Sequence, residues 1–142
     1  MKKFESMTKY LPLLENDKIG TWVIDRENVG TPEHPFHMPF VDYSEMVRSF
    51  IRDVHEFHEN NKDFELTHYS EILEKNGLKW DSESMSEADV SDLDSHCVMA
   101  LLMAAVRAER FCDGALLDFF ENGSMKKWLT RLQEIDAADC TD

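Results

Sequence analysis

An uninterrupted apolar run that ends in a charged cluster is the strongest constraint on this fold. The segment Cys97 to Val106 is ten apolar residues long, and the segment Arg107 to Gly114 follows with two arginines, a glutamate and an aspartate. A helix that is apolar on every face must be surrounded by other elements. The run falls short of the ~20 residues that a membrane-spanning helix needs. It therefore predicts a central helix of the protein interior.

The helical spacing of apolar residues continues beyond the charged cluster. It runs from Leu93 to Phe119 and passes Gly114 without a change of phase. We therefore predict one long helix from Asp92 to Glu121, although an interior glycine costs about 1 kcal/mol of helix stability.

Shorter apolar patterns predict the elements around this helix. Helical spacing indicates a first helix over residues 4–14, in which Pro12 causes a kink or begins a new turn. It also indicates an amphipathic helix over 46–57, a shorter helix over 66–73 and a last helix that begins at Ser124. The sequence Asp42-Tyr43-Ser44-Glu45 has the form of a capping box before the second of these helices. Residues 79–84 form a polar connector.

Two short runs favour β-structure. Thr21 to Ile24 and Phe36 to Val41 flank a loop, Asp25 to Pro35, that is rich in proline and glycine. The predicted fold is therefore mainly α: a single-domain helical bundle, residues 1–142, around one central long helix, with a small two-stranded β-hairpin. The tail, residues 137–142, is expected to be flexible.

Charge and cysteine content restrict the function. The chain of 142 residues has 29 acidic against 15 basic residues, a formal net charge of -14. This balance argues against binding to nucleic-acid phosphates and to anionic membranes. The cysteine number is odd, and the polar N-terminal residues do not form a signal-peptide core, so we expect reduced thiols and a cytoplasmic location.

The charged cluster is the candidate site. Arg107 and Arg110 share a helix face with Gly114, and Glu109 and Asp113 lie on a neighbouring face. A charge on a central helix must be paired or hydrated. One interpretation is a structural network in which the arginines are largely inaccessible and pair with these acids. The alternative is a site for an anionic ligand between the helix and the hairpin. Cys112 is expected to be a small buried apolar residue.

Several of these residues also resemble a known family. Trp22, Met38-Pro39, Tyr43-Ser44 and above all the run Arg107 to Gly114 are similar to small bacterial proteins catalogued only as a domain of unknown function, whose signature is Arg-x-Glu-Arg-Phe-Cys-Asp/Glu-Gly. The resemblance implies a mainly helical fold and a bacterial cytosolic origin, but no activity. It implies a candidate site without assigned roles, made of Trp22, Arg107, Glu109, Arg110 and Asp113.

Histidine pairs are the remaining constellation of interest. His34 and His37 lie in one loop, and His55 and His58 lie three residues apart on one helix. Neither pair belongs to a recognised metal-binding motif, so we expect no metal and no cofactor. The chain has no glycine-rich phosphate loop and no Gly-x-Ser-x-Gly motif.

These patterns together favour a non-catalytic binding or interaction module, whose partner is an unknown protein or small molecule. One alternative is a small enzyme or binder that acts on an anionic metabolite through Arg107, Glu109, Arg110 and Asp113. Another is an acidic decoy that occupies the nucleic-acid site of a basic protein. The sequence favours the absence of enzymatic activity.

The charge balance yields a first prediction. Fluorescence polarisation with labelled single- and double-stranded DNA and RNA should show no binding at low salt, where electrostatic attraction to phosphates is strongest. Micromolar binding under these conditions would contradict the charge argument.

Overall fold

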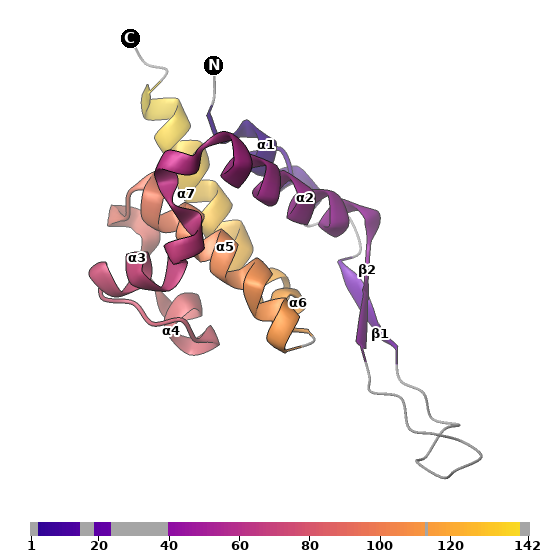
Figure 1. Ribbon diagram of the computed structural model, residues 1–142. Helices are drawn as coiled ribbons and strands as arrows, with labels where there is room; N and C mark the ends of the chain where they lie inside the picture. The colour runs from indigo at the N-terminus through magenta and orange to yellow at the C-terminus, as the bar shows by residue number, and fades with distance from the viewer. Residues whose placement is uncertain (1–2, 15–18, 24–39, 113, 140–142) are drawn as a thin grey trace, which may run out of the picture.

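The computed structural model describes residues 3–14, 19–23, 40–112 and 114–139, and these form a mainly helical fold with one β-hairpin, as predicted (Figure 1). The helices are α1 (Glu5–Thr8), α2 (Glu45–Asn60), α3 (Tyr69–Lys75), α4 (Ser82–Glu87), α5 (Ser95–Phe111), α6 (Ala115–Glu121) and α7 (Ser124–Asp139), and the strands are β1 (Gly20–Val23) and β2 (Phe40–Tyr43).

Helix α5 is the central element of the fold. All ten residues from Cys97 to Val106 are buried, which confirms the prediction from the apolar run. The helix lies in the middle of the molecule, between α2 and α3, and it packs against both of them and against α6 and α7 (Figure 1). The side chain of Asp94 caps its N-terminus, where Oδ1 accepts a hydrogen bond of 2.9 Å from the Cys97 N–H.

The prediction of one helix from Asp92 to Glu121 is wrong. Helix α5 ends at Phe111, Cys112 adopts an extended conformation, and Gly114 has a φ of 92°. This left-handed conformation cannot occur inside an α-helix. The apolar spacing continued through the break because α6 buries an apolar face of its own against the same core, with Leu116 and Phe119 among its buried residues.

Other boundaries also differ from the sequence prediction. Ser44, and not Asp42, is the N-cap of α2, because Asp42 belongs to β2 and forms an ion pair of 2.9 Å with Arg48. The first helix stops at Thr8, and the new turn expected at Pro12 is a 3₁₀ turn, Leu11–Leu13, because proline has no N–H to continue an α-helix. The polar connector includes α4.

The C-terminal segment is helical for longer than predicted. Residues 137–139 of the expected flexible tail continue α7, and residues 140–142 lie outside the described part of the chain. Helix α7 also holds the N-terminal segment in place. The buried carboxylate of Asp136 accepts a hydrogen bond of 3.0 Å from the Phe4 N–H.

The hairpin is antiparallel, and its register pairs Gly20 with Tyr43 and Trp22 with Val41. Strand β1 begins one residue before its predicted start, and β2 continues two residues past its predicted end at Val41. Ile24 and residues 36–39 of the predicted strands lie outside the described part of the chain. The strands extend from one end of α2 past the C-terminal end of α5 (Figure 1). This arrangement brings Tyr43 and Trp22 to the junction between α5 and α6.

The cap of α5 gives a prediction about stability. Replacement of Asp94 by alanine removes the acceptor for the Cys97 N–H and should lower the free energy of unfolding by about 1 kcal/mol. Replacement by asparagine keeps an acceptor and should cost a few tenths of a kcal/mol. Urea denaturation of both variants provides the measurement, and equal losses would show that the cap does not stabilise α5.

Candidate functional site

The carboxylate of Glu109 organises the junction between α5 and α6. It accepts hydrogen bonds from the Gly114 N–H, at 3.1 Å to each oxygen, and from the Leu116 N–H at 3.0 Å. N–H groups at the start of a helix have no partner within that helix. A negative charge there also interacts favourably with the helix dipole. Glu109 therefore caps α6 from the preceding helix and stabilises the turn between them.

Tyr43 connects the hairpin to this junction. Its hydroxyl donates a hydrogen bond of 2.5 Å to Glu109 and accepts one of 3.0 Å from the Leu117 N–H. Burial raises the pKa of the Tyr43 hydroxyl well above its ordinary value, and the hydrogen bond to Glu109 raises it further. The hydroxyl therefore stays protonated and keeps its donor role at all physiological pH values.

Trp22 covers Gly114 from the other strand of the hairpin. A Cβ atom added at Gly114 would lie 2.3 Å from Cζ2 of the indole. Glycine is thus required here for two reasons, the left-handed backbone and the space that the tryptophan occupies. Gly114, which the apolar spacing placed inside one long helix, is instead a turn residue packed against the side chain of Trp22.

The prediction that both arginines are largely inaccessible is wrong for Arg110, and their pairing with Glu109 is not observed, whereas pairing with Asp113 stays a prediction. Arg110 is exposed and Arg107 is partly buried, and neither forms a hydrogen bond or ion pair with another described residue. Glu109 is not their partner because its oxygens accept from backbone N–H groups and Tyr43. Asp113 lies outside the described residues.

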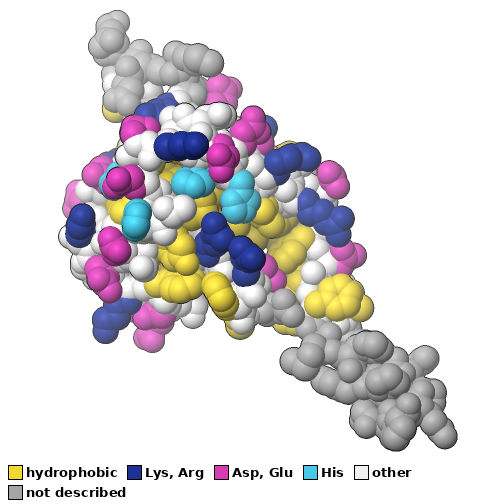
Figure 2. Space-filling model, in the orientation of Figure 1, with side chains coloured by type: hydrophobic (Ala, Val, Ile, Leu, Met, Phe, Trp, Pro, Cys, Tyr) yellow, Lys and Arg dark blue, Asp and Glu magenta, His cyan; other side chains and the backbone are white. Residues whose placement is uncertain are grey.

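The arginines line a cleft between β2, α2 and α5, which we call the arginine cleft. Its volume is about 330 Å³, and it is lined by Val41, Tyr43, Ile51, His55, Val106, Arg107, Glu109 and Arg110. Figure 2 shows this side of the molecule, where basic and histidine side chains lie next to one another among hydrophobic ones, over α5 and the adjoining part of α2.

The pKa of His55 is lowered by burial and by the positive charges of the arginine cleft. Burial lowers this pKa from its ordinary value, and the charge of Arg107 lowers it further. His58 and Arg110 act in the same direction, whereas Glu59 opposes them. The local potential is therefore positive in a protein whose net charge is -14.

His58 also has a buried Nδ1 atom without a hydrogen-bond partner in the described structure.

Two further expectations concern single residues and metals. Cys112 is exposed, so the expectation of a buried residue is wrong. The reason is that α5 ends one residue earlier, and its apolar stripe does not include Cys112.

Within the described ranges, no three His, Cys, Asp or Glu side chains converge as a metal site would require. His34 and His37 lie outside these ranges. No described helix is both long enough and apolar enough to cross a membrane.

Fold and site together define a mainly helical protein in which a hairpin packs on the broken end of a buried central helix. The chain belongs to a family of unknown function (DUF6508), whose model matches residues 1–138. Neither the curated proteins nor the solved structures contain a significant match to it.

The site residues named from the sequence are only partly adjacent in space. Trp22, Glu109 and Gly114 meet at the junction, and the two arginines lie on the adjoining cleft. His55 was not predicted as a cleft residue, because the spacing of His55 and His58 pointed only to a possible metal pair. Tyr43 was not predicted as the partner of Glu109, although the resemblance had included it.

The junction gives a prediction with a matched control. Gly123 also has a positive φ, of 86°, but an added Cβ there meets nothing within 4 Å. Gly123→Ala should therefore show only the backbone strain, about 1 kcal/mol. Gly114→Ala should lose roughly another 1–3 kcal/mol because Trp22 must move. Denaturant melts measure both losses, and adding Trp22→Ala to Gly114→Ala should recover part of the second. Equal losses in the two glycine variants would contradict the packing of Trp22 on Gly114.

Proposed function

We propose that this protein is a non-catalytic binding protein that holds a small anionic molecule, a carboxylate or a phosphate, in the arginine cleft. The observation that carries the proposal is the pair Arg107 and Arg110 beside His55, on a cleft of about 330 Å³, without a hydrogen-bonded carboxylate from the described residues. Guanidinium groups bind carboxylate and phosphate oxygens through paired N–H donors.

The surroundings of the arginines favour an anionic ligand. Among the described residues that line the cleft, Glu109 is the one acid, and its carboxylate is occupied by the N–H groups of α6 and by Tyr43. Val41, Ile51 and Val106 supply apolar walls beside the arginines. A ligand that covers these walls would exclude water from the arginine head groups and so strengthen their attraction to an anion. A ligand with an acidic group and a small apolar part fits this lining.

The same contacts favour binding over catalysis. Acid–base chemistry needs a carboxylate or imidazole that is free to exchange a proton with the substrate. Glu109 has three donors on its two oxygens and serves as a cap. His55, with its lowered pKa, is neutral near pH 7 and is suited to a hydrogen bond with the ligand. The arginines supply charge and orientation.

Calorimetric titration with a panel of inorganic phosphate, citrate, succinate and benzoate tests the proposal. The panel member that binds should lose about 10- to 100-fold in affinity when Arg107 or Arg110 is replaced by glutamine, because each forms a charge-assisted hydrogen bond of about 1.5–3 kcal/mol. Arg52→Gln is the matched control, since Arg52 is exposed on α2 and is not part of the cleft.

Histidine titration gives an independent readout. A bound anion stabilises the protonated imidazole, so the pKa of His55 measured by NMR should rise on addition of ligand. The proposal is wrong if no panel member binds at millimolar concentration, or if the cleft variants bind as tightly as Arg52→Gln. An acidic decoy would bind a basic protein and would be unaffected by these arginine variants.

A further inference from the structure

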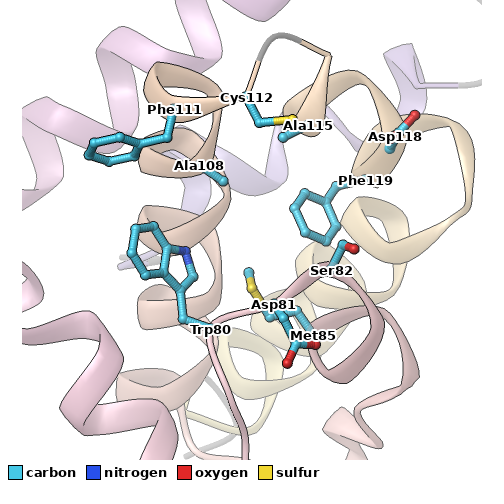
Figure 3. Close-up of a pocket in the computed structure, with 10 residues that line it drawn as sticks. All are labelled: Trp80, Asp81, Ser82, Met85, Ala108, Phe111, Cys112, Ala115, Asp118 and Phe119. Carbon is cyan, nitrogen blue, oxygen red and sulfur yellow. The ribbon is translucent and has the colours of Figure 1, made fainter.

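A second cavity lies between α4, α5 and α6, and nothing in the proposed function uses it. Its volume is about 300 Å³, and its lining includes Trp80, Met85, Ala108, Phe111 and Phe119 (Figure 3). None of its lining residues belongs to the arginine cleft, although α5 contributes to both. We call this cavity the aromatic pocket.

The aromatic walls are held in place by contacts outside the pocket. The Trp80 indole N–H donates a hydrogen bond of 3.2 Å to the Ala104 carbonyl, and its ring packs edge-on against Tyr69, with centroids 5.0 Å apart. Phe119 is buried against Trp128, with ring centroids 5.2 Å apart. The walls are therefore formed before any ligand arrives, which reduces the entropic cost of binding.

Phe111 is an unusually exposed apolar side chain at the edge of this pocket. It is the last residue of α5, and 78% of its surface is accessible, the largest value among the exposed large hydrophobic residues of the described chain. Its ring lies edge-on to Trp80, with centroids 6.0 Å apart. Phe111 therefore lies at the rim of the aromatic pocket and is not among the buried residues of the core.

The polar part of the lining is acidic. Asp81 and Asp118 line the aromatic pocket, and an adjoining hollow that shares Asp118 is lined by Glu83, Glu87 and Glu121. Among the described residues that line these two hollows there is no lysine, arginine or histidine. Asp81 caps α4 through the Ser84 N–H, whereas the carboxylate of Asp118 is exposed.

We propose that the aromatic pocket binds a small organic cation, an ammonium group attached to an apolar or aromatic body. The body would pack against Trp80, Met85 and Phe119, and the ammonium would lie at the mouth of the pocket, where the carboxylate of Asp118 points outward and attracts a cation through solvent (Figure 3). Aromatic faces attract cations, most strongly the indole. The carboxylates would repel an anion and would leave a neutral ligand without a charged partner. A cavity of about 300 Å³ has the volume of roughly ten water molecules, which is enough for a small organic molecule.

Three probes of nearly equal shape test the charge preference: 2-phenylethylammonium, 2-phenylethanol and 3-phenylpropionate. NMR titration should show shifts at Trp80 and Phe111 with the ammonium. The alcohol should bind there at least tenfold more weakly, and the carboxylate should cause no shifts there. Binding of the ammonium no tighter than that of the alcohol, or no binding of the ammonium at millimolar concentration, would overturn the proposal.

Variants separate the two contributions to binding. Asp118→Asn should bring the affinity for the ammonium close to that for the alcohol, whereas Phe111→Ala should weaken both probes. The control is Glu56→Gln, which makes the same change of charge on an exposed residue of α2. An Asp118→Asn variant with the ammonium affinity of Glu56→Gln would contradict the role of the carboxylate.

Cys112 offers a chemical readout, because it lines the aromatic pocket and its thiol is exposed. Burial raises the pKa of the Cys97 thiol to about 11, so Cys97 should react slowly. In a Cys140→Ser background, the ammonium probe should slow alkylation of Cys112 severalfold, and unchanged alkylation at saturating probe would count against occupancy of the pocket. Phosphate and citrate should not protect Cys112, so this proposal and that for the arginine cleft fail independently.

Discussion

The carboxylate of Glu109 is the interaction on which the local architecture depends. It accepts hydrogen bonds from two N–H groups at the start of α6 and from the hydroxyl of Tyr43, so one side chain stabilises the end of α5, the start of α6 and the position of the hairpin. An unpartnered N–H group costs free energy when it is buried, and the N-terminal residues of α6 are largely buried. The negative charge of Glu109 therefore stabilises the junction between α5, α6 and the hairpin.

Two hollows of different chemistry result from this arrangement. Because Glu109 is engaged at the junction, it leaves Arg107 and Arg110 without its carboxylate, and β2 completes a cleft around them. Because the chain turns at Gly114, α6 returns beside α4 and contributes Phe119 and Asp118 to the aromatic pocket. If α5 continued as one helix, α6 would not return beside α4, and β2 would not pack at the junction that borders the arginine cleft. The two proposed ligands therefore differ in charge for a reason that lies in the fold.

The candidate site could be predicted from the sequence only in part. The charged run and the resemblance marked Trp22, Arg107, Glu109, Arg110 and Asp113, but equal spacing on a helix does not show which atoms an acid will contact. Glu109 lies beside two arginines in the sequence and binds backbone N–H groups in the structure. The aromatic pocket could not be predicted, because Trp80 comes from a segment with no apolar period.

The sequence alone determined the helical class, the buried central run and the hairpin, because ten consecutive apolar residues and two β-rich runs have few stable environments. It also placed the protein in its family. Only the tertiary structure decided that α5 ends at Phe111, since the apolar phase was the same for one helix or for two. The break requires a distant tyrosine, a tryptophan on the hairpin and a glycine with positive φ to meet, and such long-range contacts leave no local periodicity in the chain.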